Sequence, residues 1–269
     1  MIILKNEKGQ AVAPKTIPMT HRDFYHDHET RIYWLGGGGV MIHSHNTNIM
    51  IDPVLKDFDM PLLYDIPIST NDIPTLDGLL ITHIDNDHFS KSTCNDLKKV
   101  CQKYHAPHYV ADVMNKEGYR TDVHNIQETF EINNVKIMLT RTVHNWQNEK
   151  EKWQYRYWDE REYCGYWFET VDGTIWLPGD SRLIEEHLHM KEPDVILFDF
   201  SDNEWHITFE GAIQLANTYP NAKLICIHWG SIDAPKMTPF NGNPEDLLDR
   251  VINPERIKVL APGEGFQLR

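Results

Sequence analysis

Two imidazoles and two carboxylates lie within six consecutive residues of this sequence. The run HIDNDH at residues 83–88 directly follows the apolar stretch 79–82, and such a density of His and Asp rarely arises by chance. A divalent cation needs three or more nitrogen or oxygen ligands at about 2.0–2.2 Å, and a turn with alternating donors can serve two adjacent cations. The run therefore predicts metal ligands at His83, Asp85, Asp87 and His88.

Each of three further candidates lies just past the end of a predicted strand. The pairs are strand 135–139 with His144, strand 174–177 with Asp180, and strand 224–227 with His228. In an α/β sheet the C-terminal ends of parallel strands share one edge, where ligands usually bind. We therefore expect these side chains to meet the 83–88 run at one rim and to complete a metal site.

Each candidate also has an ordinary structural alternative. A single histidine at a strand end is usually a hydrogen-bonded side chain, and Asp180 after Gly179 could be a turn residue or a helix N-cap. The convergence of four separate segments on one rim favours the metal site over these alternatives.

Short apolar runs alternate with helical patterns along the chain, which favours an α/β fold. Helices are predicted at residues 91–104, 181–190, 209–219 and 244–251, and a hairpin at residues 166–177 around the turn VDG. Because no repeat, low-complexity tract or linker divides the chain, residues 1–269 are expected to form a single domain. Residues 145–164 combine aromatic and charged side chains without a clear period and are expected to be an insertion.

The overall composition restricts the function. The chain has 269 residues with 40 acidic and 26 basic side chains, and its formal charge of −14 disfavours nucleic-acid binding. A small anionic substrate remains compatible, because bound divalent cations reverse the local field. No apolar run is long enough to span a membrane and no secretory signal is recognised, while four cysteines without a CxxC pair favour a cytosolic location.

The motifs and their order resemble the metallo-β-lactamase superfamily over most of the chain. The matching segments are WLG at 34–36, NIMIDP at 48–53, THIDNDH at 82–88, His144, PGD at 178–180, IHWG at 227–230 and VLAPGE at 259–264. IHWG with His206 before a helix is similar to the branch that contains L-ascorbate-6-phosphate lactonase and N-acylphosphatidylethanolamine phospholipase D. The resemblance implies a four-layer αββα sandwich with a dinuclear site at its edge.

The resemblance also implies roles for the candidate ligands. By motif position, His83 and His144 would bind the first divalent cation, Asp87, His88 and His228 the second, and Asp180 would bridge the two. Asp85 stands where the family usually has a second histidine. An oxygen-rich first site favours Mn²⁺ or Fe²⁺ over Zn²⁺ or binds weakly, so a mononuclear centre is an alternative. Asp52 would orient a ligand histidine from behind.

The chemistry implied by the resemblance is hydrolysis. A metal-bound hydroxide would attack a small ester, lactone or phosphodiester, with Asp87 and His206 as the candidate catalytic residues and His206 as hydrogen-bond donor or general acid. A helix-capping surface histidine is the alternative for His206. For the whole protein, the alternative function is a non-hydrolytic metal-binding sensor or scaffold, and Asp85 favours it. A di-iron redox protein is a third possible function.

The insertion follows His144 directly, so its base is expected beside the metals. Its aromatic faces could hold a substrate, and Lys150, Lys152, Arg156 and Arg161 could meet an anion. This charge favours a small polar anion over an acyl chain, while a homo-oligomer interface or a mobile surface loop is the alternative.

Two other features receive lesser assignments. The four glycines at residues 36–39 are followed by a strand rather than a helix, so they are expected to form a hairpin turn and not a phosphate-binding loop. His26 or His28 in the polar N-terminal segment is a minor candidate for the cleft.

Overall fold

The chain forms two β-sheets in the computed structural model, which describes residues 2–25, 28–101 and 103–269. The first sheet, in its spatial order, contains β14 (Gly265–Gln267), β1 (Thr30–Gly36), β2 (Gly39–Ser44), β3 (Thr47–Ile51), β4 (Gly78–Leu80), β5 (Tyr104–Ala106) and β6 (Thr121–Val123). The second contains β13 (Ile257–Lys258), β12 (Lys223–Cys226), β11 (Val195–Phe198), β10 (Thr174–Leu177), β9 (Cys164–Glu169), β8 (Val135–Arg141) and β7 (Thr129–Ile132).

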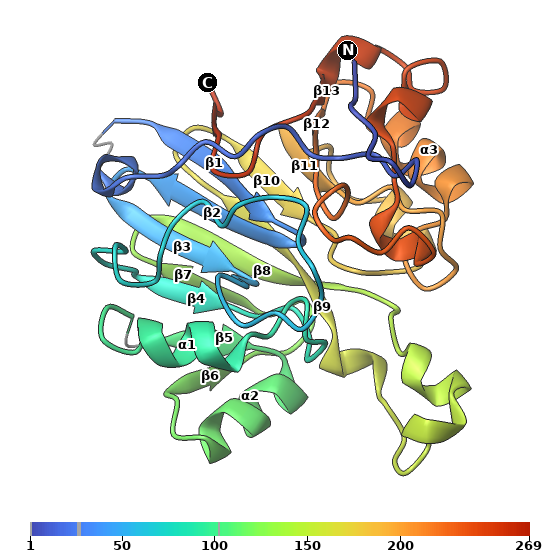
Figure 1. Ribbon diagram of the computed structural model, residues 1–269. Coiled ribbons are helices and arrows are strands. Elements are labelled where there is room, and N and C mark those ends of the chain that lie inside the picture. Colours follow the sequence, from blue (N-terminus) through green and yellow to red (C-terminus); the bar gives the residue numbers. More distant parts are fainter. Residues whose placement is uncertain (1, 26–27, 102) are drawn as a thin grey trace.

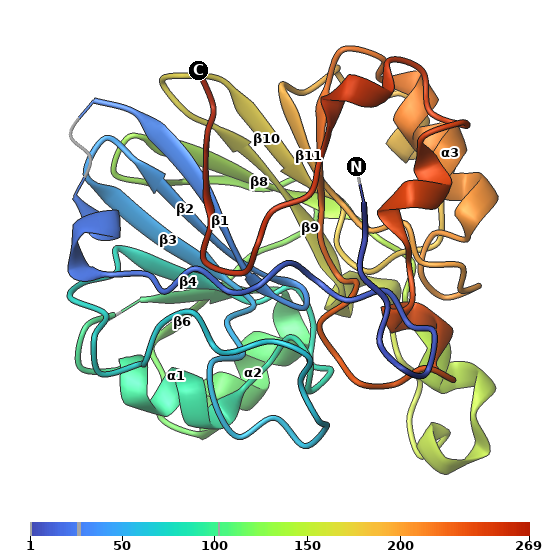
Figure 2. The ribbon, with the colours of Figure 1, turned by 45° about the horizontal axis from the view of Figure 1, so that its top comes forward.

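Helices cover the outer faces of the two sheets (Figure 1). Helices α1 (Lys91–Leu97) and α2 (His108–Lys116) lie against the first sheet, and α3 (Phe209–Thr218) lies against the second. The two views of the ribbon agree on this arrangement (Figures 1 and 2). The four-layer αββα sandwich expected from the sequence is confirmed.

Alternating side chains of the first sheet supply two separate cores. In β1, Ile32 and Trp34 join the core between the sheets, whereas Tyr33 and Leu35 join the core beneath α1 and α2. This follows from the two-residue repeat of a strand, in which successive side chains point to opposite faces. Strands buried on both faces are accordingly apolar along most of their length.

The strand directions bring the candidate residues to one edge. Strands β3 and β4 are parallel, as are β10, β11 and β12, and β8 runs in the same direction as β10 because each is antiparallel to β9. The segments after these strands therefore leave the sheets at shared ends. The expected hairpin at 166–177 is confirmed as the β9–β10 pair, and residues 36–39 form the turn between β1 and β2.

Parts of the predicted helical pattern are wrong. The helix expected at 91–104 ends at Leu97, and its last predicted residue instead opens β5, an inner strand that lies between β4 and β6. The helices expected at 181–190 and 244–251 contain only the short 3₁₀ helices Glu185–Leu188 and Pro244–Leu247. The helix at 209–219 is confirmed as α3, and α2 was not predicted.

The remaining 3₁₀ helices are His21–Phe24, Trp146–Glu149, Glu151–Trp153, Glu160–Glu162, Thr238–Phe240 and Pro254–Arg256. Three of them belong to the segment 145–164, which projects from the body of the molecule (Figures 1 and 2). None of the helices in the described part of the chain has the length and apolar composition required to cross a bilayer.

Candidate metal centre

Three of the predicted ligands form a first cluster at the sheet edge. His83 lies shortly after β4, His144 shortly after β8, and Asp85 in the turn beyond His83. The Oδ2 atom of Asp85 lies 3.6 Å from Nε2 of His83 and 3.4 Å from Nε2 of His144. The three ligand atoms lie within 4.8 Å of one another, a spacing that can hold a metal ion. The Asp85 carboxylate therefore lies where an ion between the two histidines would meet it.

Four predicted ligands form a second cluster beside the first. Nε2 of His88 lies 3.6 Å from Oδ2 of Asp87 and 3.2 Å from Oδ2 of Asp180. Nε2 of His228 lies 3.3 Å and 3.6 Å from the same two oxygens. Oδ2 of Asp180 is also 4.0 Å from Nε2 of His144 in the first cluster. The structure thus brings all seven predicted ligands together, with Asp180 between the two groups.

Asp52 supports both clusters from behind. Its Oδ2 accepts hydrogen bonds from Nδ1 of His88 at 2.8 Å and from the Thr82 hydroxyl at 2.6 Å. Its Oδ1 accepts the backbone N–H of Thr82 at 2.8 Å. Because the Thr82 hydroxyl donates to Asp52, its oxygen accepts from Nδ1 of His83, 2.9 Å away. Asp52 therefore fixes the orientation of both imidazoles, as expected from the sequence.

The outer nitrogens of the other two histidines bond to backbone carbonyls. Nδ1 of His144 donates to the carbonyl of Trp205 at 2.7 Å, and Nδ1 of His228 donates to that of Pro239 at 3.2 Å. A carbonyl only accepts hydrogen bonds, so Nδ1 carries a proton in each ring and Nε2 is the nitrogen left to bind a metal.

The buried nitrogens of the site fit a metal. Nε2 of His83, His88 and His228 has no hydrogen-bond partner among the described residues, although each atom is buried. An unpaired buried polar atom is costly, and the great majority find a partner. Three such atoms beside carboxylates are the donor set that a divalent cation requires. The residues present therefore fit the group that the sequence predicts.

Electrostatics favour positive charge in the centre. Burial alone would raise the pKa of the Asp180 carboxyl, but the nearby His228 and His88 hold that pKa well below its usual range. Burial likewise opposes protonation of His228, yet Asp180 and Asp87 raise its pKa to about 9. The carboxylates are therefore ionised, and their charge must be balanced by protons or by cations.

Residues of the insertion hold Asp85 in place. The indole N–H of Trp146 donates to Oδ2 of Asp85 at 2.8 Å, and the amide of Gln147 donates to Oδ1 at 3.0 Å. The hydroxyl of Tyr163 donates in turn to Oε1 of Gln147 at 2.6 Å. The base of the insertion lies beside the candidate ligands, as expected. The roles of Trp146 and Gln147 were not predicted, and their position directly after His144 is the only signal in the sequence.

His206 lies beside Asp180 and is bonded to a residue that the sequence reasoning missed. Its Nδ1 lies 2.7 Å from Oδ2 of Asp199, and its Nε2 lies 3.6 Å from Oδ2 of Asp180. Only 4% of His206 is exposed, and Thr208 caps α3, so the alternative of a helix-capping surface histidine is wrong. Asp199 follows the last residue of β11 and obeys the same strand-end rule as the predicted ligands.

The glycine turn packs directly under the second cluster. A Cβ atom on Gly38 would lie only 2.5 Å from Cε1 of His88, so this position leaves room for the ligand ring. The backbone N–H of His228 donates to the carbonyl of Gly37 at 2.9 Å. Of the minor candidates for the cleft, His28 is exposed and is not among the residues that line the cavity beside the site, and His26 lies outside the described residues.

The chain is similar to known proteins over most of its length. The model of the β-lactamase superfamily domain matches residues 47–229. A UPF0173 metal-dependent hydrolase of Sulfurisphaera tokodaii is 23% identical, and the match covers 88% of this chain and 99% of that protein.

Two solved structures show the same fold. One is a possible metal-dependent hydrolase from Veillonella parvula, at a TM-score of 0.72 and 19% identity over 89% of this chain and 99% of that chain. The other is an isothiocyanate hydrolase from Delia radicum gut bacteria, at a TM-score of 0.70 and 18% identity over 88% and 98%. The family model spans more than half of the described fold and includes every candidate ligand, and the chain therefore belongs to the β-lactamase superfamily.

Proposed function

We propose that this protein is a metal-dependent hydrolase that uses two divalent cations at the seven-ligand site. The observation that carries the proposal is the set of three buried imidazole nitrogens, beside ionised carboxylates, that have no hydrogen-bond partner in the described part of the chain. Bound cations at such a site lower the pKa of a coordinated water and polarise the carbonyl or phosphoryl oxygen of a substrate. Relatives that are named metal-dependent hydrolases support the same reaction class.

We assign the first cation to His83, Asp85 and His144, and the second to Asp87, His88 and His228, with Asp180 between them. The carboxylates of Asp85 and Asp180 would then face the first cation, and two carboxylates favour Mn²⁺ or Fe²⁺. Across both clusters, the three imidazoles whose Nε2 atoms have no partner among the described residues also suit Zn²⁺. The hydrogen bonds from Trp146 and Gln147 support Asp85 as a ligand and thereby a dinuclear rather than a mononuclear centre.

His206 and Asp87 are the proposed catalytic residues. Because Nδ1 of His206 is held by Asp199, its Nε2 is fixed at the cavity surface, where it can donate a hydrogen bond or a proton to the leaving oxygen of a substrate. Asp199 acts through His206 and is a positioning residue. One oxygen of Asp87 lies in the second cluster, and its carboxylate also borders the cavity, so it can accept a proton from the attacking water.

The proposed substrates are a small ester, a lactone such as that of the L-ascorbate-6-phosphate lactonase type, or a phosphodiester. The decisive experiment measures metal content per chain on protein purified without chelator. Hydrolysis of simple lactones and of bis(p-nitrophenyl) phosphate is then measured before metal removal, after it, and after reconstitution. Two metals per chain with metal-dependent turnover are expected.

The outcome of this experiment separates the proposal from the sensor or scaffold alternative. Metal binding without any turnover after reconstitution would favour that alternative. The role of His206 has its own test: His206→Ala should lower kcat/KM about 10²- to 10⁴-fold, whereas His189→Ala, an exposed histidine outside the site, should not. Full activity of His206→Ala would remove it from the mechanism.

We also propose a cytosolic location. The four cysteines, Cys94, Cys101, Cys164 and Cys226, are buried free thiols, and burial raises the pKa of each. Buried protonated thiols are stable in a reducing compartment and carry no disulfide framework. Fractionation of the producing cell with an antibody against the protein tests this location.

A further inference from the structure

A cavity of about 760 Å³ opens directly over the candidate metal centre. Among its lining residues are Asp85, Asp87, Asp180, His144 and His206, which form the side next to the metals. A volume in this range suits a small molecule, most of whose surface is then buried. The other lining residues therefore indicate which chemical groups the substrate carries next to the bond that is hydrolysed.

One wall of the cavity consists of aromatic side chains of the insertion. The ring of Trp153 lies edge-on to Trp146 at 6.0 Å and to Trp158 at 6.3 Å, and Tyr155 lies edge-on to Trp158 at 6.1 Å. The indole N–H of Trp158 donates to the carbonyl of Trp153 at 3.0 Å. Tyr109 of α2 completes the wall. The aromatic rings hold one another, so the wall exists before a substrate binds.

A second group of lining residues is also apolar. It contains Phe58, Met60, Met237 and Phe240. Phe58 and Met60 pack against the small core of Ile232, Ala234 and Phe240, which fixes their position. A ligand in the cavity would therefore meet the apolar side chains of both groups, and burial of its own apolar surface would stabilise the complex.

The two arginines of the insertion, Arg156 and Arg161, do not line this cavity. The guanidinium of Arg156 lies 3.9 Å from the ring centres of both Tyr109 and Trp158 and pairs with Glu162. Arg161 pairs with Asp159 on the surface. The prediction that these two arginines could meet an anion is therefore wrong, because their charges are already used in local pairs.

Little net charge remains on the lining. Apart from the candidate ligands and His206, the charged residues on the described lining are Lys150 and Glu204, one of each sign. A polyanionic substrate would find few cationic partners there. The composition of the insertion therefore no longer supports the prediction that the substrate is a small polar anion.

We propose that the substrate is an uncharged carboxylic ester or lactone that carries an aryl or bulky apolar group next to the bond that is hydrolysed. This inference rests on the proposed hydrolase function and names its substrate class. The carbonyl lies at the metal end, within reach of His206, and the apolar group fills the part of the cavity lined by the aromatic residues of the insertion and by Phe58, Met60, Met237 and Phe240.

Binding of product-like carboxylates to the metal-loaded protein tests the proposal without requiring turnover. Acetate, cyclohexylacetate and 1-naphthylacetate share one carboxylate and differ in the apolar group. Their dissociation constants are measured by isothermal titration calorimetry. The two larger acids are expected to bind about 10- to 100-fold more tightly than acetate, because their rings are buried. Equal affinity of all three would overturn the proposal.

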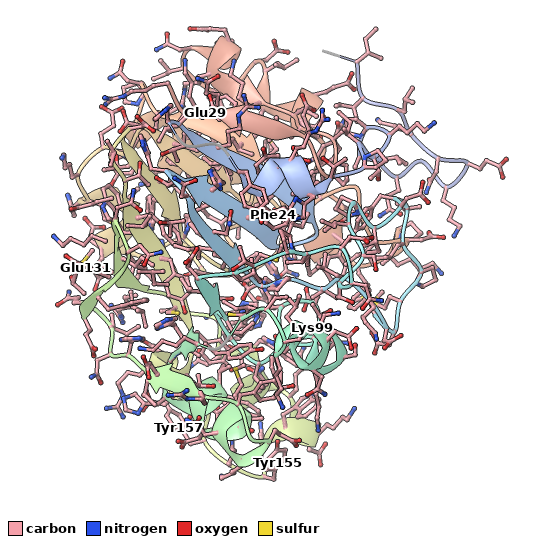
Figure 3. All side chains as sticks on the ribbon, turned by 90° about the vertical axis from the view of Figure 1, so that its left-hand side faces the viewer. Phe24, Glu29, Lys99, Glu131, Tyr155 and Tyr157 are labelled. Atoms are coloured by element: carbon pink, nitrogen blue, oxygen red, sulfur yellow. The ribbon has the colours of Figure 1, made fainter. Side chains whose placement is uncertain are left out.

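Two exposed tyrosines of the insertion offer a matched pair of variants. Figure 3 shows Tyr155 and Tyr157 at the same end of the molecule; they are 68% and 72% exposed, but only Tyr155 lines the cavity. Tyr155→Ser should weaken 1-naphthylacetate several-fold and leave acetate unchanged, whereas Tyr157→Ser should change neither. Equal effects of the two variants on 1-naphthylacetate would contradict the assigned wall.

Measurements of hydrolysis then test the inferred substrate class separately from the proposed hydrolase function. A higher kcat/KM for methyl 1-naphthylacetate than for both methyl acetate and bis(p-nitrophenyl) phosphate is expected. A preference for the phosphodiester would overturn the carbonyl substrate. Normal discrimination among the acids with no turnover of any ester, lactone or phosphodiester would overturn the hydrolase function and leave the apolar-group specificity standing.

Discussion

Replacing Trp146 with phenylalanine should weaken one metal site and leave the other unchanged. Phenylalanine keeps an aromatic ring in the cavity wall but removes the N–H that donates to Oδ2 of Asp85 at 2.8 Å. Asp85 would then be held by Gln147 alone, and its carboxylate could rotate away from His83 and His144. The effect should be confined to the cation that these three residues bind.

The expected size follows from the strength of this bond. A hydrogen bond to a charged group contributes about 1.5–3 kcal/mol. Trp146 is only half-buried, so the lower end of this range applies. About 1.5 kcal/mol corresponds to roughly a tenfold change in a binding constant. This agrees with the 10- to 100-fold loss that is typical when a residue supporting a metal ligand is removed.

A titration of metal-free protein with Zn²⁺ or Mn²⁺ against a chromophoric chelator resolves the two binding steps. Trp146→Phe should shift one step about tenfold and leave the second in place. Trp153→Phe is the matched control, because it makes the same change in the same wall without a bond to Asp85. If both steps are unchanged in Trp146→Phe, or if the control shifts equally, the indole does not position Asp85.

Three further predictions concern the support of the site and the stability of the fold. Asp52→Ala should lower affinity at the second metal site about 10- to 100-fold in the same titration, because His88 loses its orienting carboxylate; unchanged affinity would contradict this role. Gly38→Ala should impair the same site, since its Cβ would meet His88 at 2.5 Å, whereas Gly37→Ala, whose Cβ meets nothing within 4 Å, should affect stability alone. Burial lowers the pKa of His105 to about 4, from about 6.5 in the unfolded chain, so the unfolded state takes up the proton first and stability falls as the pH drops from about 6.5 to 4. At pH 5 the resulting loss in the free energy of unfolding is about 2 kcal/mol. Urea unfolding in the presence of chelator, at pH 7 and at pH 5, should show that His105→Gln loses less stability on acidification than the parent. An equal loss in the two proteins would refute the assignment.

The candidate ligands could be found from the sequence because their signal is local. Four of the seven lie within residues 83–88, and the others follow apolar runs that are long enough to be recognised as strands. Asp199 satisfies the same rule and could have been included. The bonds from Trp146 and Gln147 to Asp85 span about sixty residues, and a single sequence contains no periodicity that reports such a contact.

The errors in the predicted helices also arise because distant contacts leave no signal in the local sequence. Residues 91–104 carry an apolar pattern that suits one helix, but the chain must leave α1 after Leu97 to place β5 beside β4 in the sheet. Tertiary pairing overrides the local pattern there. Helix α2 buries only Val110, Ala111 and Met114, which gives too short an apolar stripe to be recognised. The 3₁₀ helices are too short to show a period at all.

The order in which the chain builds its sheets gives the metal centre a mechanical consequence. His83, Asp85, Asp87 and His88 follow strand β4 of the first sheet, whereas His144, Asp180 and His228 follow strands of the second. A cation bound by both sets would join two halves of the polypeptide that already meet through apolar contacts, through hydrogen bonds such as those from Trp146 and Gln147 to Asp85, and through β14, which returns to pair with β1. This return strand supports our proposal that residues 1–269 form one domain. At a hundredfold excess over its dissociation constant, each cation of the proposed centre would add about 2.7 kcal/mol to the stability of the folded chain, so the link between the two halves would strengthen with metal supply.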